Sequence, residues 1–384
     1  MNKSICFLKS VVVLVLLLYS TFTEAQNLTS NSTGSFVFSP SGPLSNQPIE
    51  VFYHIPDGDI SSMPIVFSFH GANRDANNYR DYWINMANAN NFMVFAPEFS
   101  STHYPGLGDN YLMANIFDDG DNPSPSTFNN PDEWTFSVID PIFNQIKADI
   151  NGSQPAYNAW GHSGGAQFLH RFVLYMPNSQ LDVAVCSNAG WYTVPENSVS
   201  FPYGILNGQL PNADVVNAFS KKLIVHLGQN DNDPNSPGLR HNAVVDNQQG
   251  LHRLERGQYF FNTSQTQAQN QSATFNWEKH EVPNVGHDPQ LMANDALPYV
   301  MMSTLSTQDF SDESRIKIYP NPSKDVVYLD ASGFNISLVE LYTINGHLLR
   351  QYQKRALEQI DISDLESGVY ILKVDQYFKR IIKN

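Results

Sequence analysis

The chain has 384 residues and a formal net charge of −15, from 22 Lys and Arg against 37 Asp and Glu. This length suits one large domain followed by a small one. The acidic balance argues against a nucleic-acid-binding protein, because binding to phosphates normally requires the opposite charge. Residues 26–309 contain 26 acidic and 10 basic side chains, a net of −16, whereas residues 310–384 contain 10 of each. We interpret the acidic excess as a contribution to solubility.

Residues 1–25 have the pattern of a signal peptide. Lys3 and Lys9 precede an apolar run at residues 11–18, and Ala25 provides a small residue for signal peptidase. The run is short for a membrane-spanning helix, and no later segment has 18 apolar residues in succession. We therefore expect an exported chain whose mature form has no transmembrane segment. Cys186 is the only cysteine after the leader, so no intramolecular disulfide is expected.

Strand and helix patterns alternate in the first part of the large domain. Residues 35–38 and 49–55 are predicted strands, the second with alternating apolar positions. The denser apolar run 64–69 predicts an inner strand, followed by a helix at 77–88 and a strand at 92–97. This order indicates a mostly parallel sheet with crossover helices, which is an α/β fold.

A long polar stretch, residues 98–130, interrupts this alternation and predicts a functional rim or lid. Asp118, Asp119 and Asp121 within it have the carboxylate spacing of a calcium loop, although a solvated acidic turn is the favoured interpretation because no glutamate follows at EF-hand spacing. A helix is predicted from Pro131 to about residue 151, with a kink near Pro141.

The motif Gly161-His162-Ser163-Gly164-Gly165 fits the pattern G-x-S-x-G. A predicted strand at 156–160 precedes it, and a helix pattern at 167–176 follows it. A serine on such a strand-to-helix turn is typical of a nucleophile, and glycines two residues away on either side let strand and helix cross closely. The sequence therefore predicts Ser163 as a nucleophile.

Further strands are predicted at 183–187, 223–227 and 273–280. Between the last two, residues 231–270 form a long polar insertion that we expect to cap the site. Trp191 and Tyr192, which follow the strand at 183–187, are expected to contribute to the substrate pocket.

A serine hydroxyl needs a base to accept its proton and an acid to orient that base. Asp231, just after the strand at 223–227, is the favoured acid, with Asp233 as the alternative. His287 is the favoured base among the 11 histidines, because it follows Gly286 in the loop after the last strand. The backbone N–H groups of Ala72 and Gly164 are predicted to form the oxyanion hole. No cofactor and no metal ligand set is assigned.

The chain from about 35 to 305 resembles the α/β-hydrolase superfamily, especially secreted esterases of the polyhydroxybutyrate-depolymerase and feruloyl-esterase type. The segments that carry the resemblance are H-G-A-N-R-D at 70–75, A-P-E-F at 96–99, G-H-S-G-G at 161–165, G-Q-N-D at 228–231 and V-G-H-D at 285–288. The resemblance implies that Ser163 attacks an ester carbonyl, His287 transfers the proton and Asp231 holds the imidazole. The paired cysteines of many secreted members are not found here.

Residues 308–315 form a polar linker, and residues 316–384 have the strand and turn pattern of a small β-sandwich with a hairpin turn at Asn345-Gly346. This tail closely resembles the C-terminal sorting domain of type IX secretion, through Y-P-N-P at 319–322, G-V-Y at 368–370 and the basic end at 379–383. The resemblance implies recognition by the type IX machinery and export across the outer membrane.

The sequence thus predicts an α/β-hydrolase domain at 26–307 that cleaves carboxylic esters outside the cell, on a polymeric or plant-derived substrate. A serine peptidase on the same fold and a non-catalytic surface adhesin are the alternatives.

Overall fold

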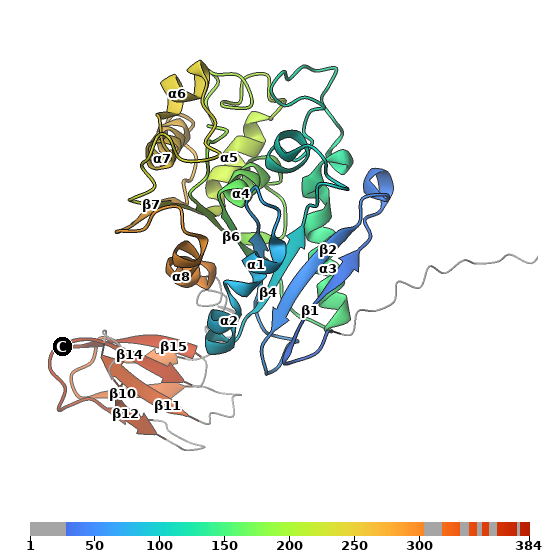
Figure 1. Ribbon diagram of the computed structural model, residues 1–384. Coiled ribbons are helices and arrows are strands. Elements are labelled where there is room, and N and C mark those ends of the chain that lie inside the picture. The colour runs from blue at the N-terminus through green and yellow to red at the C-terminus, as the bar shows by residue number, and fades with distance from the viewer. Residues whose placement is uncertain (1–27, 303–316, 331–337, 344–347, 353–358, 375–376) are drawn as a thin grey trace, which may run out of the picture.

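The computed structural model describes residues 28–302, 317–330, 338–343, 348–352, 359–374 and 377–384 (Figure 1). The predicted leader at 1–25, the predicted linker at 308–315 and the predicted turn at Asn345-Gly346 lie outside these residues. Within the described residues, no helix combines the length and apolar character needed to span a membrane.

The large domain is built on an eight-stranded sheet with the order β1-β2-β4-β3-β5-β6-β7-β8. Its strands are β1 Ser32–Phe38, β2 Ile49–Ile55, β3 Ile65–Phe69, β4 Met93–Glu98, β5 Tyr157–His162, β6 Leu181–Ser187, β7 Lys222–Gly228 and β8 Trp277–Val282. The strands from β4 to β8 along this order pair in parallel, whereas β1 and β2 form an antiparallel edge. The predicted mostly parallel sheet is confirmed.

Helices cover both faces of this sheet, which explains the dense apolar runs of its inner strands. On β3 and β4, Val66 and Val94 face one core, and Phe67 and Phe95 face the other. The first core includes α1 Ala76–Asp81, α2 Ile84–Asn90 and α8 Pro289–Val300, and the second includes α3 Ile139–Asp149, α4 Gly164–Tyr175, α5 Asn212–Ser220 and α7 Arg253–Asn270.

Two helix predictions need correction. The helix predicted at 77–88 is divided into α1 and α2. The helix predicted from Pro131 begins instead as two short 3₁₀ turns, Pro131–Glu133 and Thr135–Val138, before α3. Pro141 lies in the first turn of α3, where the backbone N–H has no intrahelical acceptor, so a proline there does not require a kink.

The insertion at 231–270 is mostly helical, so the prediction of a polar cap is wrong for its second half. It contains α6 Ala243–Gln249 and the 18-residue helix α7. Helix α7 packs against β7 and buries Arg256, Phe260, Ser264 and Ala268 on one face. Because most of these buried residues are polar or small, the helix carries little hydrophobic periodicity.

The C-terminal residues, drawn in orange to red in Figure 1, form two antiparallel sheets. One contains β9 Lys317–Tyr319, β10 Val326–Asp330 and β13 Gln359–Asp361, and the other contains β11 Val339–Thr343, β12 Leu348–Tyr352, β14 Gly368–Val374 and β15 Tyr377–Lys383. Val327 from the first sheet and Leu341 and Leu372 from the second share one buried core. The predicted all-β domain is confirmed, and its basic end at 379–383 forms the last part of β15.

Candidate active site

Ser163 lies on the sharp turn between β5 and α4, with φ 55° and ψ −111°. A non-glycine residue at positive φ is strained, and such strain is concentrated at functional sites. The two flanking glycines permit the turn. A Cβ added at Gly161 would overlap the backbone of Gly165, and one added at Gly165 would overlap the carbonyl of Phe69. The serine is therefore presented at the carboxyl ends of the parallel strands.

Three side chains from separate loops form one hydrogen-bonded chain at this turn. The Nε2 atom of His287 lies 3.1 Å from Ser163 Oγ, and its Nδ1 atom lies 2.6 Å from Asp231 Oδ2. When Nδ1–H donates to the carboxylate, Nε2 is left as the acceptor for the serine hydroxyl. Asp233 is exposed and accepts from the backbone of Asn235, so His287 contacts Asp231 and not the alternative acid.

Asp231 also contacts a cation, Arg253, which no sequence motif marks. Arg253 Nη1 lies 3.3 Å from the second carboxylate oxygen of Asp231, and both side chains are only 4% exposed. The same guanidinium donates to Ser236 Oγ and to the carbonyl of Pro237. The carboxylate is thus held between an imidazole on one oxygen and a guanidinium on the other.

Asn188, directly after β6, connects the loops that carry the acid and the base. Its Nδ2 donates to the carbonyl of Gly286 at 3.0 Å, and its Oδ1 accepts from the N–H of Gly228 at 2.7 Å. The N–H of Asn230 donates to Val285 O at 2.8 Å. These bonds fix the spacing between the two loops.

His162 lies beneath His287, with 4.5 Å between the ring centroids. Burial, together with the nearby His287 and Arg253, lowers the pKa of His162 well below its ordinary value. Its Nδ1 is 3.2 Å from the hydroxyl of Tyr79. His162 is therefore a neutral packing residue and does not compete with His287 for the serine proton.

The two predicted oxyanion-hole residues lie next to each other. A Cβ built on Gly164 would be 3.1 Å from the backbone nitrogen of Ala72, and one built on Gly71 would be 3.8 Å from Ser163 Cβ. The neighbouring His70 is fully buried, and burial lowers its pKa to about 4. Its Nε2 accepts from the N–H of Phe99, which leaves Nδ1–H to donate to the Gly71 carbonyl and hold the turn.

The prediction that Trp191 and Tyr192 line the substrate pocket is not met by their side chains. Tyr192 is fully buried and stacks on Phe260 with 4.4 Å between ring centroids. Trp191 is 2% exposed, and its indole ring packs against the guanidinium groups of Arg171 and Arg240 at 4.0 and 4.9 Å. Both side chains are core residues because the segment after β6 continues into the domain interior.

The acidic turn at 118–122 uses its carboxylates within the protein. Asp121 forms a two-pronged ion pair with Arg240. Asp119 accepts from the backbone of Asp121 and Asn122 and from the side chain of Asn122. These contacts favour the interpretation as a solvated acidic turn.

A cavity of ≈ 390 Å³ lies at the opposite edge of the sheet from Ser163. Its lining includes Leu181, Lys222 and Trp277, which are the first residues of β6, β7 and β8. Ligands of parallel α/β sheets bind at the carboxyl ends of the strands. We therefore assign no part of the active site to this cavity.

Arg253 and Asn188 are not predicted from the sequence, because no motif marks a residue that acts through another. Arg253 is the first residue of α7, which lies in the segment predicted as a polar insertion. For Asn188, the available sequence signal was an amide side chain directly after a predicted parallel strand, where it can form hydrogen bonds to neighbouring loops.

Comparison with known proteins gives two kinds of match. The model of the secretion system C-terminal sorting domain matches residues 317–384. The solved structure of poly(aspartic acid) hydrolase-1 from Sphingomonas sp. KT-1 is 33% identical, with a TM-score of 0.65, over 71% of this chain and 99% of that one. A poly(3-hydroxybutyrate) depolymerase from Bordetella parapertussis is 24% identical, with a TM-score of 0.64, over 74% of this chain and 94% of that one. No match was found among curated protein sequences.

Proposed function

The chain belongs to the α/β-hydrolase superfamily, and on this basis we propose that it is a serine hydrolase that cleaves carboxylic esters through Ser163, His287 and Asp231. Its sorting domain directs it to type IX secretion, so it is an exported hydrolase that works outside the cell or on its surface.

The observation that carries the proposal is the continuous hydrogen-bonded chain from Asp231 through His287 to Ser163, with distances of 2.6 and 3.1 Å. In the proposed reaction, His287 Nε2 accepts the serine proton as Oγ attacks the ester carbonyl. The attack forms a tetrahedral intermediate. Its negatively charged oxygen accepts hydrogen bonds from the N–H groups of Ala72 and Gly164.

Collapse of this intermediate breaks the bond to the alcohol, which leaves with the proton that His287 carried. Water then attacks the acyl group on Ser163, with His287 again as the base, and the carboxylic acid is released. Asp231 remains ionised throughout and holds the imidazole in the tautomer that accepts at Nε2. Arg253 keeps the carboxylate in place from the other side.

A polymeric ester is the substrate class that we favour. One protein with a similar fold is a poly(3-hydroxybutyrate) depolymerase, so this fold is known to carry an enzyme that cleaves a polyester. Export supports a substrate too large to enter the cell.

The second candidate is an amide bond, because the relative at 33% identity is a poly(aspartic acid) hydrolase. Poly(aspartic acid) is a polyanion, and the segment 26–309 has a net charge of −16. Like charges slow the encounter at low ionic strength, which would lower the rate of association with this polymer.

The first test compares the wild type with Ser163→Ala on p-nitrophenyl acetate. The variant should lose at least about 10⁴-fold in kcat while its circular dichroism stays unchanged. A rate near that of the wild type would reject Ser163 as the nucleophile.

The second test separates the two substrate classes. Turnover is measured on a poly(3-hydroxybutyrate) film and on poly(aspartic acid), and on an ester and an anilide that share one acyl group. Faster turnover of the film and the ester supports the ester proposal. Faster turnover of poly(aspartic acid) and the anilide supports the amide candidate.

A further inference from the structure

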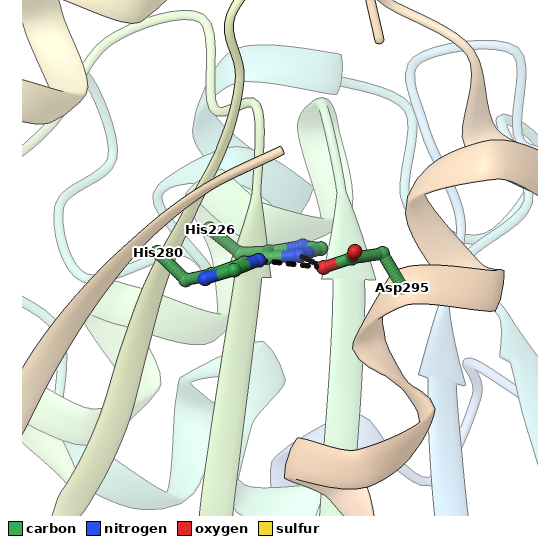
Figure 2. A group of neighbouring side chains, drawn as sticks. All are labelled: His226, His280 and Asp295. Atoms are coloured by element: carbon green, nitrogen blue, oxygen red, sulfur yellow. Dashed lines mark hydrogen bonds and ion pairs between the residues drawn. The ribbon is translucent and has the colours of Figure 1, made fainter. Parts of the chain in front are cut away.

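Two histidines and one aspartate meet on the sheet face opposite α4 and outside the active site (Figure 2). His226 comes from β7, His280 from β8 and Asp295 from α8. His226 and His280 are register partners in the parallel pairing of their strands, so both side chains project from the same face of the sheet. Figure 2 shows the two imidazole rings edge-on and nearly parallel, with the carboxylate of Asp295 from α8 at their edge.

The three potential ligand atoms converge on one point. The Nε2 atoms of His226 and His280 each lie 2.9 Å from Asp295 Oδ1, and all three atoms fall within 4.8 Å of one another. Ligands about 2.0–2.1 Å from a tetrahedral metal ion are separated by about 3.3 Å. The two nitrogen–oxygen separations would therefore need to open by a few tenths of an ångström to admit an ion.

A second set of contacts orients the buried histidine. His226 is fully buried, and its Nδ1 lies 2.7 Å from Ser187 Oγ, which also accepts from Trp160 Nε1 at 2.8 Å. A histidine that binds a metal through one ring nitrogen usually forms a hydrogen bond through the other, and Nδ1 of His226 has such a partner. When Nε2 binds a cation, the ring proton resides on Nδ1, where Ser187 Oγ is placed to accept it.

The site is also accessible. The side chains of His280 and Asp295 are 35% and 32% exposed, so an ion can enter and retain water as a further ligand. The ring of Tyr299 packs against both imidazoles and closes one side of the cluster.

We propose that His226, His280 and Asp295 bind one divalent transition-metal ion of the Zn²⁺ class. Two imidazole nitrogens and one carboxylate oxygen suit zinc, whereas calcium and magnesium prefer ligand sets made of oxygen. Three protein ligands and one water complete a tetrahedral set.

The ion would connect the elements that carry the proposed acid and base. Strand β7 leads to Asp231, β8 leads to His287, and α8 begins just after that histidine. The metal would therefore stabilise the base of these loops, and it is separated from the turn of Ser163 by Ser187, whose carbonyl accepts the N–H of Ser163. Its binding is measurable whether or not Ser163 is the nucleophile.

The competing interpretation is a metal-free cluster in which Asp295 accepts one hydrogen bond from each imidazole. Both arrangements share the same side-chain positions, but only metal binding predicts a saturable site. The experiment uses untagged full-length protein, treated with EDTA and titrated with ZnCl₂ by calorimetry. We expect one ion per chain, and at about 100 times the Kd a rise in Tm of about 5 °C.

The variants His280→Ala and Asp295→Asn each remove one ligand from a partly exposed position and should weaken Zn²⁺ binding at least about 100-fold. His241→Ala is the matched control, because His241 pairs with Asp246 at 3.0 Å in a cluster that has no third ligand among the described residues. It should bind Zn²⁺ like the wild type.

A second measurement does not depend on the variants folding. Co²⁺ replaces Zn²⁺ in the wild type, and intense visible absorption indicates the expected four-coordinate geometry. Absence of saturable Zn²⁺ binding, or equal binding by the wild type, His280→Ala and Asp295→Asn, would overturn the proposal. Weak absorption typical of six-coordinate Co²⁺ would overturn the proposed geometry.

Discussion

At the residue scale, Asp231 is a buried carboxylate with a different partner on each oxygen. His287 contacts Oδ2 and Arg253 contacts Oδ1. A buried charge that loses its partner is left uncompensated, which typically costs about 3–5 kcal/mol. Arg253 is thus a positioning residue that acts on the reaction through Asp231.

Replacing Arg253 with Met keeps much of the side-chain volume and removes the charge. We expect kcat for p-nitrophenyl acetate to fall roughly 10- to 100-fold with little change in KM, because the loss affects the orientation of His287 and not substrate binding. Steady-state kinetics measure both constants. Arg253→Lys should recover part of kcat, and a Met variant with wild-type kcat would contradict this role.

The site residues differ in how well the sequence predicts them. Ser163, Asp231 and His287 directly follow or flank strand patterns, and chemistry restricts the choice of residue type at each position. Trp191 and Tyr192 were misassigned because an aromatic pair after a strand has the same pattern whether it lines a pocket or fills a core. Only the packing of Phe260 and of two arginines against these residues separates the cases.

At the element scale, the crossing of β5 and α4 depends on the absence of two side chains. A Cβ at Gly165 would overlap the carbonyl of Phe69 in β3, and backbone atoms in a sheet cannot move aside cheaply. This requirement explains why the strand pattern before Ser163 and the helix pattern after it can be joined so tightly.

Gly165→Ala should lower the free energy of unfolding by about 3 kcal/mol or prevent folding. Urea denaturation of purified protein measures the change. Gly108→Ala serves as the control, since the nearest atom to its added Cβ is 3.8 Å away. Equal midpoints for the wild type and Gly165→Ala would show that the crossing is looser than the structure indicates.

The inner strands were predictable because burial on both faces requires continuous apolar runs, as in β3. Helix α7 was not predictable in this way. The guanidinium of buried Arg256 bonds to the carbonyl of Gly190 and to Asp246, so a charged side chain occupies a core-facing position. Only the tertiary partners make this burial favourable, and one of them, the carbonyl of Gly190, lies 66 residues away in the sequence.

At the scale of the whole molecule, three buried histidines relate stability to pH. Burial lowers the pKa of His70 to about 4, and it lowers the pKa values of His162 and His170 well below their ordinary value of 6.5. Below pH 6.5 the unfolded chain binds protons that the folded chain does not, so the free energy of unfolding decreases as the pH falls.

We therefore expect the urea midpoint to decrease from pH 7.5 to pH 5. Each fully titrating histidine contributes a slope of about 1.4 kcal/mol per pH unit. Proton uptake on unfolding at pH 5, measured in weakly buffered solution, should accompany the decrease. A midpoint that rises as the pH falls would contradict the assignment of these histidines as buried and neutral.

The sorting domain has its own core and its own sheets, which separates its function from catalysis. A chain that ends at residue 307 should retain kcat/KM within about 2-fold, because no proposed catalytic residue lies beyond His287. In the producing cell this chain should accumulate in the periplasm, since the segment matched by the sorting-domain model has been removed. Fractionation and activity assays of both forms measure the two effects, and secretion of the shortened chain would contradict this division of roles.

The most direct test of the central claim is labelling with a fluorophosphonate, which reacts with a serine that an adjacent base activates. We expect one label per chain, located by peptide mass spectrometry on Ser163, with loss of esterase activity in proportion to labelling. The Ser163→Ala protein should remain unlabelled. Labelling of a different serine, or full activity after complete labelling of Ser163, would show that Ser163 is not the nucleophile.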